Sequence, residues 1–336
     1  MSVAVNPYPA LSTREAITLF CGCDENYAQH LGVMLYSAID NVSQDLDIYV
    51  LNIGLRRSSV SKLTALARAK GVSITFLDFS DNKLSRFYTS RYITGASYLR
   101  LLAPEVLPTE CSRAIYLDCD TLVYGDLAEL WNMDLKGLAM AAVQDIGRPF
   151  IDTGSIIKTS TKRTTISDYA EHGIAPDDPY LNAGVLVLDL DQWRDEGITP
   201  KCLEIAANKQ YESHDQDVLN VVLHENWLTL PPKWNVAYQV FRLHSFDQGP
   251  YSSPEFVDCV VDPRVLHFTG RAKPWQRLCP HPMTKEYWRF LDQTPWQGAS
   301  PEPIPIRRSL GRLKWRMEMI VGSALHGKPA YLSHIK

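Results

Sequence analysis

Two aspartates separated by one residue, Asp118 and Asp120, directly follow an apolar segment at 113–117 that is typical of a buried strand. If the chain turns after the strand, both carboxylates can face one crevice. Such a pair suits a hard divalent cation that takes its remaining ligands from water and from a diphosphate. Aspartate is also common in turns and helix caps, so a plain turn is the alternative interpretation.

Four further segments bring polar or small residues to the ends of predicted strands or helices. They are 24–27, 180–184, 214–217 and 267–275. Tyr27 can stack on a nucleobase, the amide of Asn182 can bond to sugar hydroxyls, and the imidazole of His267 is a good ligand for Mn²⁺-like ions. Each segment also has a structural interpretation, as a helix cap, a turn or a buried histidine.

The elements that must position these residues alternate between strand and helix patterns in the first half of the chain. Helices are predicted at 29–40 and at 58–70, the second opened by a serine cap. Strands are predicted at 16–21, 46–53, 72–79, 113–117, 138–143, 184–189 and 227–230. This alternation predicts an α/β protein with a parallel, doubly wound sheet whose carboxyl edge forms a ligand crevice. Residues 146–180 and those beyond His267 are expected to be largely irregular.

Composition and charge exclude some classes of protein. With 45% hydrophobic and 21% charged residues, the chain can bury a large core, and a net charge of -4 gives no polycationic surface for nucleic acid. The seven cysteines are scattered, which favours buried thiols in a reducing compartment. Because no signal pattern or apolar segment of ~20 residues occurs, we expect a cytoplasmic protein.

The C-terminal residues form a distinct basic segment. Between residues 307 and 336, seven arginines and lysines stand against the single acid Glu318, and residues 309–325 have a helical apolar stripe. This helix could bind the inner face of a membrane peripherally or dock on its own domain. We therefore expect a catalytic domain at 14–290, followed by a proline-rich linker and basic amphipathic tail at 291–336.

Taken in order, six segments resemble glycosyltransferase family 8, especially the bacterial lipooligosaccharide galactosyl- and glucosyltransferases. They are Asp-Glu-Asn-Tyr at 24–27, Tyr-Leu-Arg at 98–100, Tyr-Leu-Asp-Cys-Asp at 116–120, Tyr-Leu-Asn-Ala-Gly-Val at 180–185, His-Asp-Gln-Asp at 214–217 and His-Phe-Thr-Gly-Arg-Ala-Lys-Pro-Trp at 267–275. The resemblance implies a GT-A fold. It also implies retaining transfer of glucose or galactose from a UDP-sugar to a saccharide acceptor in lipopolysaccharide, lipooligosaccharide or other surface-glycan synthesis. The implied cofactor is Mn²⁺, with Mg²⁺ as the alternative.

The matched positions imply roles for individual residues. The implied metal ligands are Asp118, Asp120 and His267. The implied nucleotide contacts are Asp24, Asn26, Tyr27, Asp118, Cys119, Asp120, Gly270 and Lys273. The implied donor-sugar contacts are Arg100, Asp145, Asn182, Ala183, Gly184, Asp215 and Gln216. Asp215 and Gln216 are also the catalytic candidates, and because an amide is a poor nucleophile, we expect same-face attack by the acceptor hydroxyl within a tight ion pair.

Three other functions stay open on the residues alone. A non-catalytic UDP-sugar-binding protein would keep the uridine and metal residues, but the intact Asn182, Asp215 and Gln216 argue against it. A glycogenin-like self-glucosylating protein would use the same site with itself as acceptor. A metal-dependent phosphohydrolase would need an activated water and usually more carboxylate ligands than Asp118 and Asp120.

Overall fold

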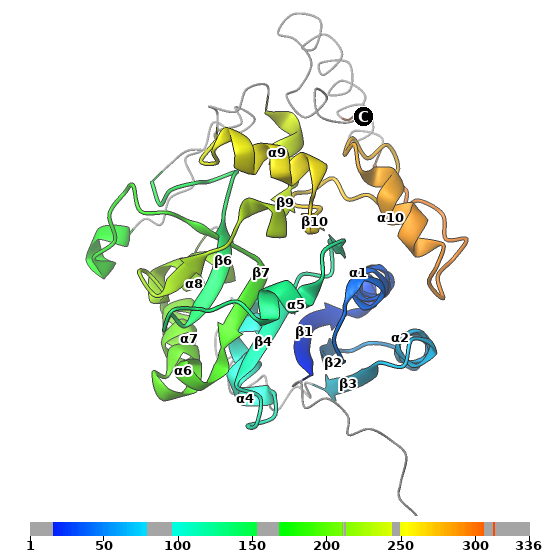
Figure 1. Ribbon diagram of the computed structural model, residues 1–336, viewed down its shortest axis with the longest axis horizontal. Helices are drawn as coiled ribbons and strands as arrows, with labels where there is room; N and C mark the ends of the chain where they lie inside the picture. The colour runs from blue at the N-terminus through cyan, green and yellow to red at the C-terminus, as the bar shows by residue number, and fades with distance from the viewer. Residues whose placement is uncertain are drawn as a thin grey trace, which may run out of the picture.

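A seven-stranded sheet in the order β3-β2-β1-β4-β7-β6-β8 forms the centre of the molecule (Figure 1). The computed structural model describes residues 16–78, 96–152, 168–209, 211, 213–243, 249–305 and 312. The strands are β1 Ile17–Asp24, β2 Leu46–Ile53, β3 Ser73–Asp78, β4 Arg113–Leu117, β6 Met140–Gln144, β7 Leu181–Asp189 and β8 Trp227–Thr229. The predicted α/β class is confirmed, with strands close to the predicted ranges.

The sheet is mostly parallel, and β7 is the exception to the predicted parallel direction. It runs antiparallel to both of its neighbours, β4 and β6. It also begins at Leu181, earlier than the predicted 184–189. Because β7 is reversed, its first residues lie beside the last residues of its neighbours, with Val185 opposite Leu117 and Leu181 opposite Gln144. This reversal places the 180–184 segment at the same edge as Asp118.

Helices cover both faces of the sheet (Figure 1). They include α1 Ala28–Asn41, α2 Arg57–Ala69, α4 Ala103–Val106, α5 Leu127–Trp131, α6 Leu190–Asp195, α7 Ile198–Asn208, α8 Asp215–Val222, α9 Ser253–Val261 and α10 Thr284–Leu291, with 3-10 helices η1 Glu25–Tyr27, η2 Ala96–Leu102, η3 Tyr169–His172, η4 Pro232–Trp234 and η5 Tyr238–Arg242. Successive side chains of a strand point to opposite faces, so Leu19 and Cys21 join one apolar cluster and Phe20 the other. Two apolar layers therefore enclose the sheet.

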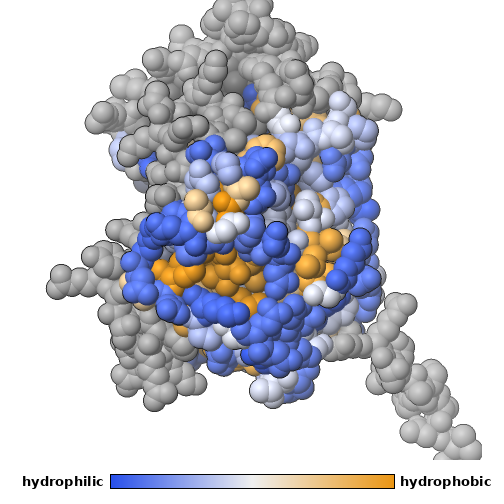
Figure 2. All heavy atoms as spheres, turned by 90° about the vertical axis from the view of Figure 1, so that its left-hand side faces the viewer, coloured by the Kyte–Doolittle hydropathy of each residue, from blue (hydrophilic) through white to orange (hydrophobic). Residues whose placement is uncertain are grey.

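The second of these apolar layers reaches the surface on the side of the molecule that carries α6, α7 and α8. Leu203, Ile205 and Val222 are half-buried there and pack against the cluster that contains Phe20. Figure 2 shows this side, where a patch of hydrophobic residues is surrounded by hydrophilic ones.

A smaller sheet of three strands, in the order β5-β10-β9, stands beside the main one. Its strands are β5 Thr121–Val123, β9 Val236–Ala237 and β10 Val265–His267. β10 pairs antiparallel with β5, so that His267 lies opposite Thr121, and parallel with β9, so that His267 lies opposite Ala237. Because β5 starts directly after Asp120, this pairing brings His267 to the two aspartates.

Two local predictions were wrong. The N-cap of α2 is Arg56, without a serine cap, and the Glu25 carboxylate instead accepts from the Arg56 backbone N–H at 2.8 Å and from the Ser59 hydroxyl at 3.1 Å. The region beyond His267 also contains α10, whose apolar positions pack into the core. A helix of eight residues has only about two turns, which is too short for a clear apolar periodicity beside several prolines.

The predicted helix at 309–325 lies outside the described residues, except for Arg312. Among the described helices, none combines the length and the apolar character that crossing a bilayer requires. The chain after α10 first packs against the domain, because the Glu302 N–H donates to the Trp275 carbonyl at 2.8 Å and the Arg277 N–H donates to the Glu302 carbonyl at 3.0 Å. The domain boundary at 290 and the membrane contact of the tail stay predictions.

Acidification is expected to destabilise the fold through His30 of α1. This ring is buried and stacked on Trp275 with centroids 3.5 Å apart, and burial lowers the pKa of His30 to about 3, from the ordinary value of 6.5. Because the unfolded state then binds the proton first, the free energy of unfolding should fall as pH decreases from about 6.5 towards 3. Urea unfolding measured at pH 7.5 and 5 tests this.

A His30→Gln variant is the control for this prediction, because it removes the titrating ring. Its free energy of unfolding should fall less between pH 7.5 and 5 than that of the wild type. Some fall should remain, since burial also lowers the pKa of His281 to about 3. An equal fall in both proteins would contradict the assignment to His30.

Candidate active site

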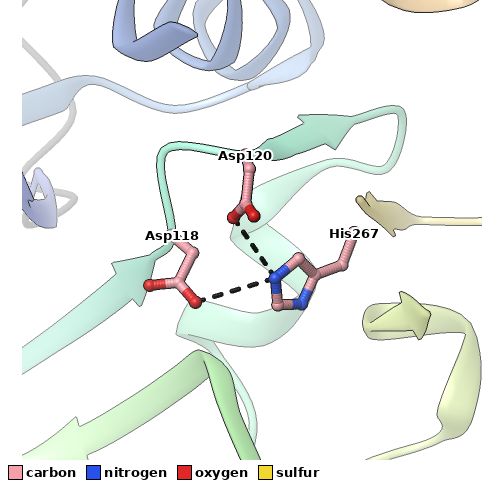
Figure 3. A group of neighbouring side chains, drawn as sticks. All are labelled: Asp118, Asp120 and His267. Carbon is pink, nitrogen blue, oxygen red and sulfur yellow. Dashed lines mark ion pairs between the residues drawn. The ribbon is translucent and has the colours of Figure 1, made fainter. Parts of the chain in front are cut away.

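Asp118, Asp120 and His267 meet at the carboxyl end of β4 (Figure 3). Their ligand atoms all lie within 4.8 Å of one another. Nε2 of His267 is 3.2 Å from a carboxylate oxygen of Asp120 and 3.7 Å from one of Asp118. Two carboxylates and one imidazole suit a divalent cation such as Mn²⁺ and leave further coordination positions for water or phosphate oxygens. The residues therefore fit the metal set that the sequence predicted.

A turn that follows β4 holds Asp118 and Asp120 next to each other. The Thr121 N–H and hydroxyl both donate to the Asp118 carbonyl, at 3.2 and 2.8 Å, and the Asp118 N–H donates to the Gly184 carbonyl at 2.9 Å. The Phe268 N–H donates to the Asp120 carbonyl at 3.0 Å, which ties the turn to the end of β10. The alternative interpretation as a turn is thus also correct, and the turn is what presents both carboxylates.

Lys273 lies directly beside Asp120. Its ammonium group contacts the Asp120 carboxylate and donates to the Phe268 carbonyl at 2.7 Å. Burial by itself would raise the pKa of Asp120, but Lys273 and His267 together lower it below its ordinary value. Asp120 is therefore held in the ionised form that a metal ligand needs.

Arg100 links the metal cluster to the predicted donor-sugar residues. Its buried guanidinium lies 2.9 Å from a carboxylate oxygen of Asp118 and 2.9 Å from one of Asp215, and it donates to the Ala183 carbonyl. It also stacks over the ring of Tyr116, whose hydroxyl donates to Asp118 at 2.7 Å. The sequence motif contained Tyr116, but the role of its hydroxyl emerges only from this contact.

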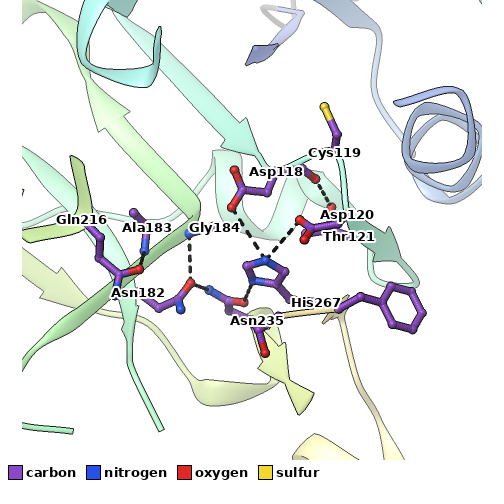
Figure 4. A network of polar contacts seen from close by, with 12 residues as sticks. Asp118, Cys119, Asp120, Thr121, Asn182, Ala183, Gly184, Gln216, Asn235 and His267 are labelled. Carbon is purple, nitrogen blue, oxygen red and sulfur yellow. Dashed lines mark hydrogen bonds and ion pairs between the residues drawn. The ribbon is translucent and has the colours of Figure 1, made fainter. Parts of the chain in front are cut away.

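A second group of predicted donor-sugar residues is joined by hydrogen bonds, of which Figure 4 shows the one between Ala183 and Gln216. The Asn182 amide donates to Asp145 at 2.8 Å, and the Gln216 amide donates to the same carboxylate oxygen at 3.3 Å. The Gln216 carbonyl oxygen accepts from the Ala183 N–H at 3.1 Å. The structure thus brings Gln216, a catalytic candidate, together with three of the predicted sugar contacts.

Gly184 has a structural requirement that its sequence context did not indicate. A methyl group added at Gly184 would lie 2.5 Å from Nδ1 of His267 and closer still to its Cε1. Contacts this short do not occur between real atoms, so His267 needs the empty space that glycine leaves. The sequence predicted a small residue here to admit a ligand, whereas the structure shows it admitting the imidazole ring.

Four of the predicted nucleotide contacts, Tyr27, Asp118, Cys119 and Asp120, line one pocket, whereas Asp24, Asn26, Gly270 and Lys273 do not line it. A pocket of about 270 Å³ is lined by Gly22, Tyr27, Arg100, Tyr116, Asp118, Cys119 and Asp120. Tyr27 is 37% exposed, and Asp24 caps η1 by accepting from the Tyr27 N–H at 3.1 Å. The capping role of Asp24 is therefore observed, while the other oxygen of Asp24 lies 3.4 Å from the Asn26 amide. Gly270 is not among the residues that line this pocket, and its φ of 81° is one that glycine adopts readily.

All seven cysteines are free, and all except Cys111 are buried, which confirms the predicted buried thiols. The thiol of Cys119, between the two aspartates, donates to the Gly22 carbonyl at 3.2 Å. This contact ties the turn at 118–121 to β1.

Asn235 is a site residue that sequence reasoning missed. It is 2% exposed, and its side-chain oxygen lies 2.9 Å from Nδ1 of His267. A single asparagine between Trp234 and Val236 carries no local signal of function. Only the pairing of β9 with β10 places it beside the imidazole.

Comparisons with known proteins agree with this arrangement. The family described as Glycosyl transferase family 8 matches residues 18–279. General stress protein A of Bacillus subtilis (strain 168) is 30% identical over 280 residues, which cover 81% of this chain and 92% of that protein. Lipopolysaccharide 1,2-glucosyltransferase of Escherichia coli (strain K12) is 29% identical over 294 residues, which cover 87% of this chain and 82% of that protein.

Solved structures of glycosyltransferases share the fold. The galactosyltransferase LgtC, solved in complex with donor and acceptor sugar analogs, has a TM-score of 0.66 at 24% identity, over 88% of this chain and 100% of LgtC. The bifunctional glycosyltransferase WbbM has a TM-score of 0.69 at 22% identity, over 88% of this chain and 52% of WbbM. These likenesses confirm the GT-A fold. Because the family match spans most of its length, the chain belongs to glycosyl transferase family 8.

Proposed function

We propose that this protein transfers a hexose, glucose or galactose, from a UDP-sugar to a saccharide acceptor with retention of anomeric configuration. The observation that carries the proposal is the convergence of Asp118, Asp120 and His267 beside the pocket that Tyr27 lines. Two relatives named for glucosyl or galactosyl transfer onto lipopolysaccharide support a hexose donor. The acceptor proposed is a saccharide of lipopolysaccharide, lipooligosaccharide or another surface glycan, reached from the cytoplasmic side.

The metal-binding residues and Lys273 would hold the diphosphate of the donor. Mn²⁺, with Mg²⁺ as the alternative, would be bound by Asp118, Asp120 and His267 and would supply positive charge against the developing negative charge of departing UDP. Lys273 lies close enough to Asp120 to turn its ammonium group to a phosphate oxygen, and Gly270 is proposed to contact the same group. Tyr27 would stack on the uracil ring, with Asp24 and Asn26 bonding to the uridine.

Same-face attack by the acceptor hydroxyl is the mechanism proposed for retention. Double displacement needs a free carboxylate as nucleophile. Asp215 is the carboxylate next to Gln216, and its side chain is 6% exposed and paired with the guanidinium of Arg100. Pairing with the guanidinium stabilises the charge of Asp215 and lowers its nucleophilicity, and burial restricts access to the carboxylate. Gln216 is held by Asp145 and the Ala183 N–H, an arrangement that suits a residue orienting the sugar.

Turnover of a panel of UDP-sugars tests the proposed function. UDP release should require Mn²⁺ or Mg²⁺, stop with a chelator, and occur with UDP-glucose or UDP-galactose far more than with other donors. Release of UDP with a transferred hexose excludes a binding protein, and release of sugar phosphate in place of UDP would indicate a phosphohydrolase. Intact-mass analysis separates self-glucosylation, because each added hexose increases the protein mass. No metal-dependent UDP release from any donor would overturn the proposal.

Replacing Lys273 with glutamine is expected to lower kcat/KM by roughly 10²-fold, the lower end of the range for removing one electrostatic group from an active site. The amide can still donate a hydrogen bond, but it brings no positive charge to the diphosphate. Initial rates at saturating Mn²⁺ measure the effect. Lys70→Gln is the matched control, because Lys70 pairs with Asp40 at 2.6 Å on the surface. Equal rates for Lys273→Gln and wild type would remove Lys273 from the diphosphate site.

A further inference from the structure

A chain of hydrogen bonds runs from the metal cluster to the donor-sugar residues through Asn235 and Asn182 (Figure 4). Nδ1 of His267 lies 2.9 Å from the Asn235 side-chain oxygen, and the Asn235 amide donates to the Asn182 side-chain oxygen at 2.8 Å. The Asn182 amide donates in turn to Asp145 at 2.8 Å. Asn235 and Asn182 are buried, so water competes little for these bonds.

The donor and the acceptor of each of these hydrogen bonds can be assigned, because the Gly184 N–H can only donate and the Asp145 carboxylate accepts. The Gly184 backbone N–H can only donate, and it lies 3.0 Å from one side-chain atom of Asn182, which must therefore be oxygen. The other Asn182 atom faces the Asp145 carboxylate and must be the amide nitrogen. Since the Asn182 oxygen can only accept, the Asn235 atom that faces it is also nitrogen.

The orientation of the Asn235 amide fixes the tautomer of His267. With its nitrogen turned to Asn182, Asn235 presents only oxygen to the imidazole, so Nδ1 of His267 must carry the proton. In the neutral imidazole Nε2 then carries the lone pair, and this is the atom that lies 3.2 Å from a carboxylate oxygen of Asp120 and 3.7 Å from one of Asp118. Neutral imidazole with a lone pair directed at the cation is the form that binds metal.

We propose that Asn235 is a positioning residue that holds His267 in its metal-binding tautomer and, through Asn182, couples the metal site to Asp145 and Gln216. The inference rests on the proposed metal-dependent function. It deepens that function, because the same residues that bind the cation then set the orientation of the amide groups beside the donor sugar. The fold supplies the geometry, since Asn235 directly precedes β9 and β9 pairs with β10.

The test measures Mn²⁺ affinity in the full-length protein at saturating UDP, from the electron paramagnetic resonance signal of free Mn²⁺. Asn235→Ala removes the acceptor for Nδ1–H and should weaken Mn²⁺ binding about tenfold to 100-fold, the usual range for a lost second partner of a ligating histidine. Asn235→Asp keeps an acceptor for Nδ1–H, so its Mn²⁺ affinity should stay within about threefold of wild type.

Asn235→Asp should nevertheless lower kcat by roughly tenfold at saturating Mn²⁺, because a carboxylate cannot donate to Asn182 and the coupling is lost. A purely structural role for Asn235 would not separate the two measurements in this way. Asn226→Ala is the matched control: its amide accepts from the Ala139 N–H at 3.0 Å and donates to Glu196 at 3.2 Å, at the opposite end of β6. Its Mn²⁺ affinity should equal that of wild type.

The outcomes separate this inference from the proposed function. Wild-type protein that binds no Mn²⁺, or His267→Ala that binds it equally well, overturns the metal site itself. Wild-type binding that depends on His267, together with unchanged affinity in Asn235→Ala, overturns only the role of Asn235. If Asn235→Ala does not fold, Asn235→Asp decides, because equal loss of Mn²⁺ affinity and kcat in that variant contradicts the proposed tautomer.

Discussion

Replacing Asp120 with asparagine is expected to lower kcat/KM for UDP-sugar turnover by roughly 10³-fold, the upper range for removing one electrostatic group from an active site. Asp120 is the carboxylate that lies closest to both His267 and Lys273. An amide oxygen has the same shape but no charge, so it binds a divalent cation weakly. Lys273 also loses the partner that holds it beside the diphosphate position.

Two measurements establish that this loss is local. Circular dichroism and thermal unfolding show whether Asp120→Asn is folded, and titration with Mn²⁺ shows whether higher metal concentration restores part of the rate, as a weakened site predicts. Asp40→Asn is the matched control, since Asp40 pairs with Lys70 at 2.6 Å on the surface and should change stability by less than about 1 kcal/mol. Activity of Asp120→Asn within tenfold of wild type would show that Asp120 does not bind the metal.

Gly184→Ala is expected to lower Mn²⁺-dependent activity by roughly 10²-fold, although it adds only one methyl group. The new Cβ would lie 2.5 Å from Nδ1 of His267 and nearer to Cε1. The backbone of Gly184 is held by two hydrogen bonds, because its carbonyl accepts from the Asp118 N–H at 2.9 Å and its N–H donates to the Asn182 side-chain oxygen at 3.0 Å. We therefore expect the imidazole to move instead. A displaced ring would lose the hydrogen bond between Nδ1 and Asn235, and Nε2 would no longer face the two aspartates.

Stability and function should separate for two alanine variants with similar clashes. Gly184→Ala should lose about 1–3 kcal/mol of unfolding free energy by overpacking and most of its Mn²⁺ affinity. Gly32→Ala would place its Cβ 2.5 Å from the ring of Trp296, and the contacts it would make do not include Asp118, Asp120 or His267, so it should lose stability with unchanged kcat. If both variants keep full Mn²⁺ affinity, the space at Gly184 is not what positions His267.

Much of the main sheet could be predicted from local patterns. A buried strand shows as a short apolar run, and the polar residues that end it show where a ligand edge begins, as at 113–120. These features depend on neighbours in sequence, so the sequence carries them directly. The ordered motifs added the family and the fold, and both are confirmed by the comparisons.

The contacts between distant segments that assemble the site could not be predicted in the same way. The reversal of β7, the pairing of β5 with β10, and the position of Asn235 beside His267 all join segments that are far apart in the chain. The apolar pattern of a strand indicates which of its faces is buried, but it does not indicate which other strand will pair with that strand. The motif residues were identified, whereas the contacts among them were not.

Local residue patterns were sufficient to predict the strands that end in polar residues, the α/β class, and a set of candidate groups for binding a cation and a diphosphate. Contacts between segments distant in the chain set which groups neutralise one another, such as Arg100 with Asp118 and Asp215, and which nitrogen of His267 faces the aspartates. The physical reason is that hydrophobic burial follows local residue type, while the direction of a buried hydrogen bond depends on partners that only folding brings within reach.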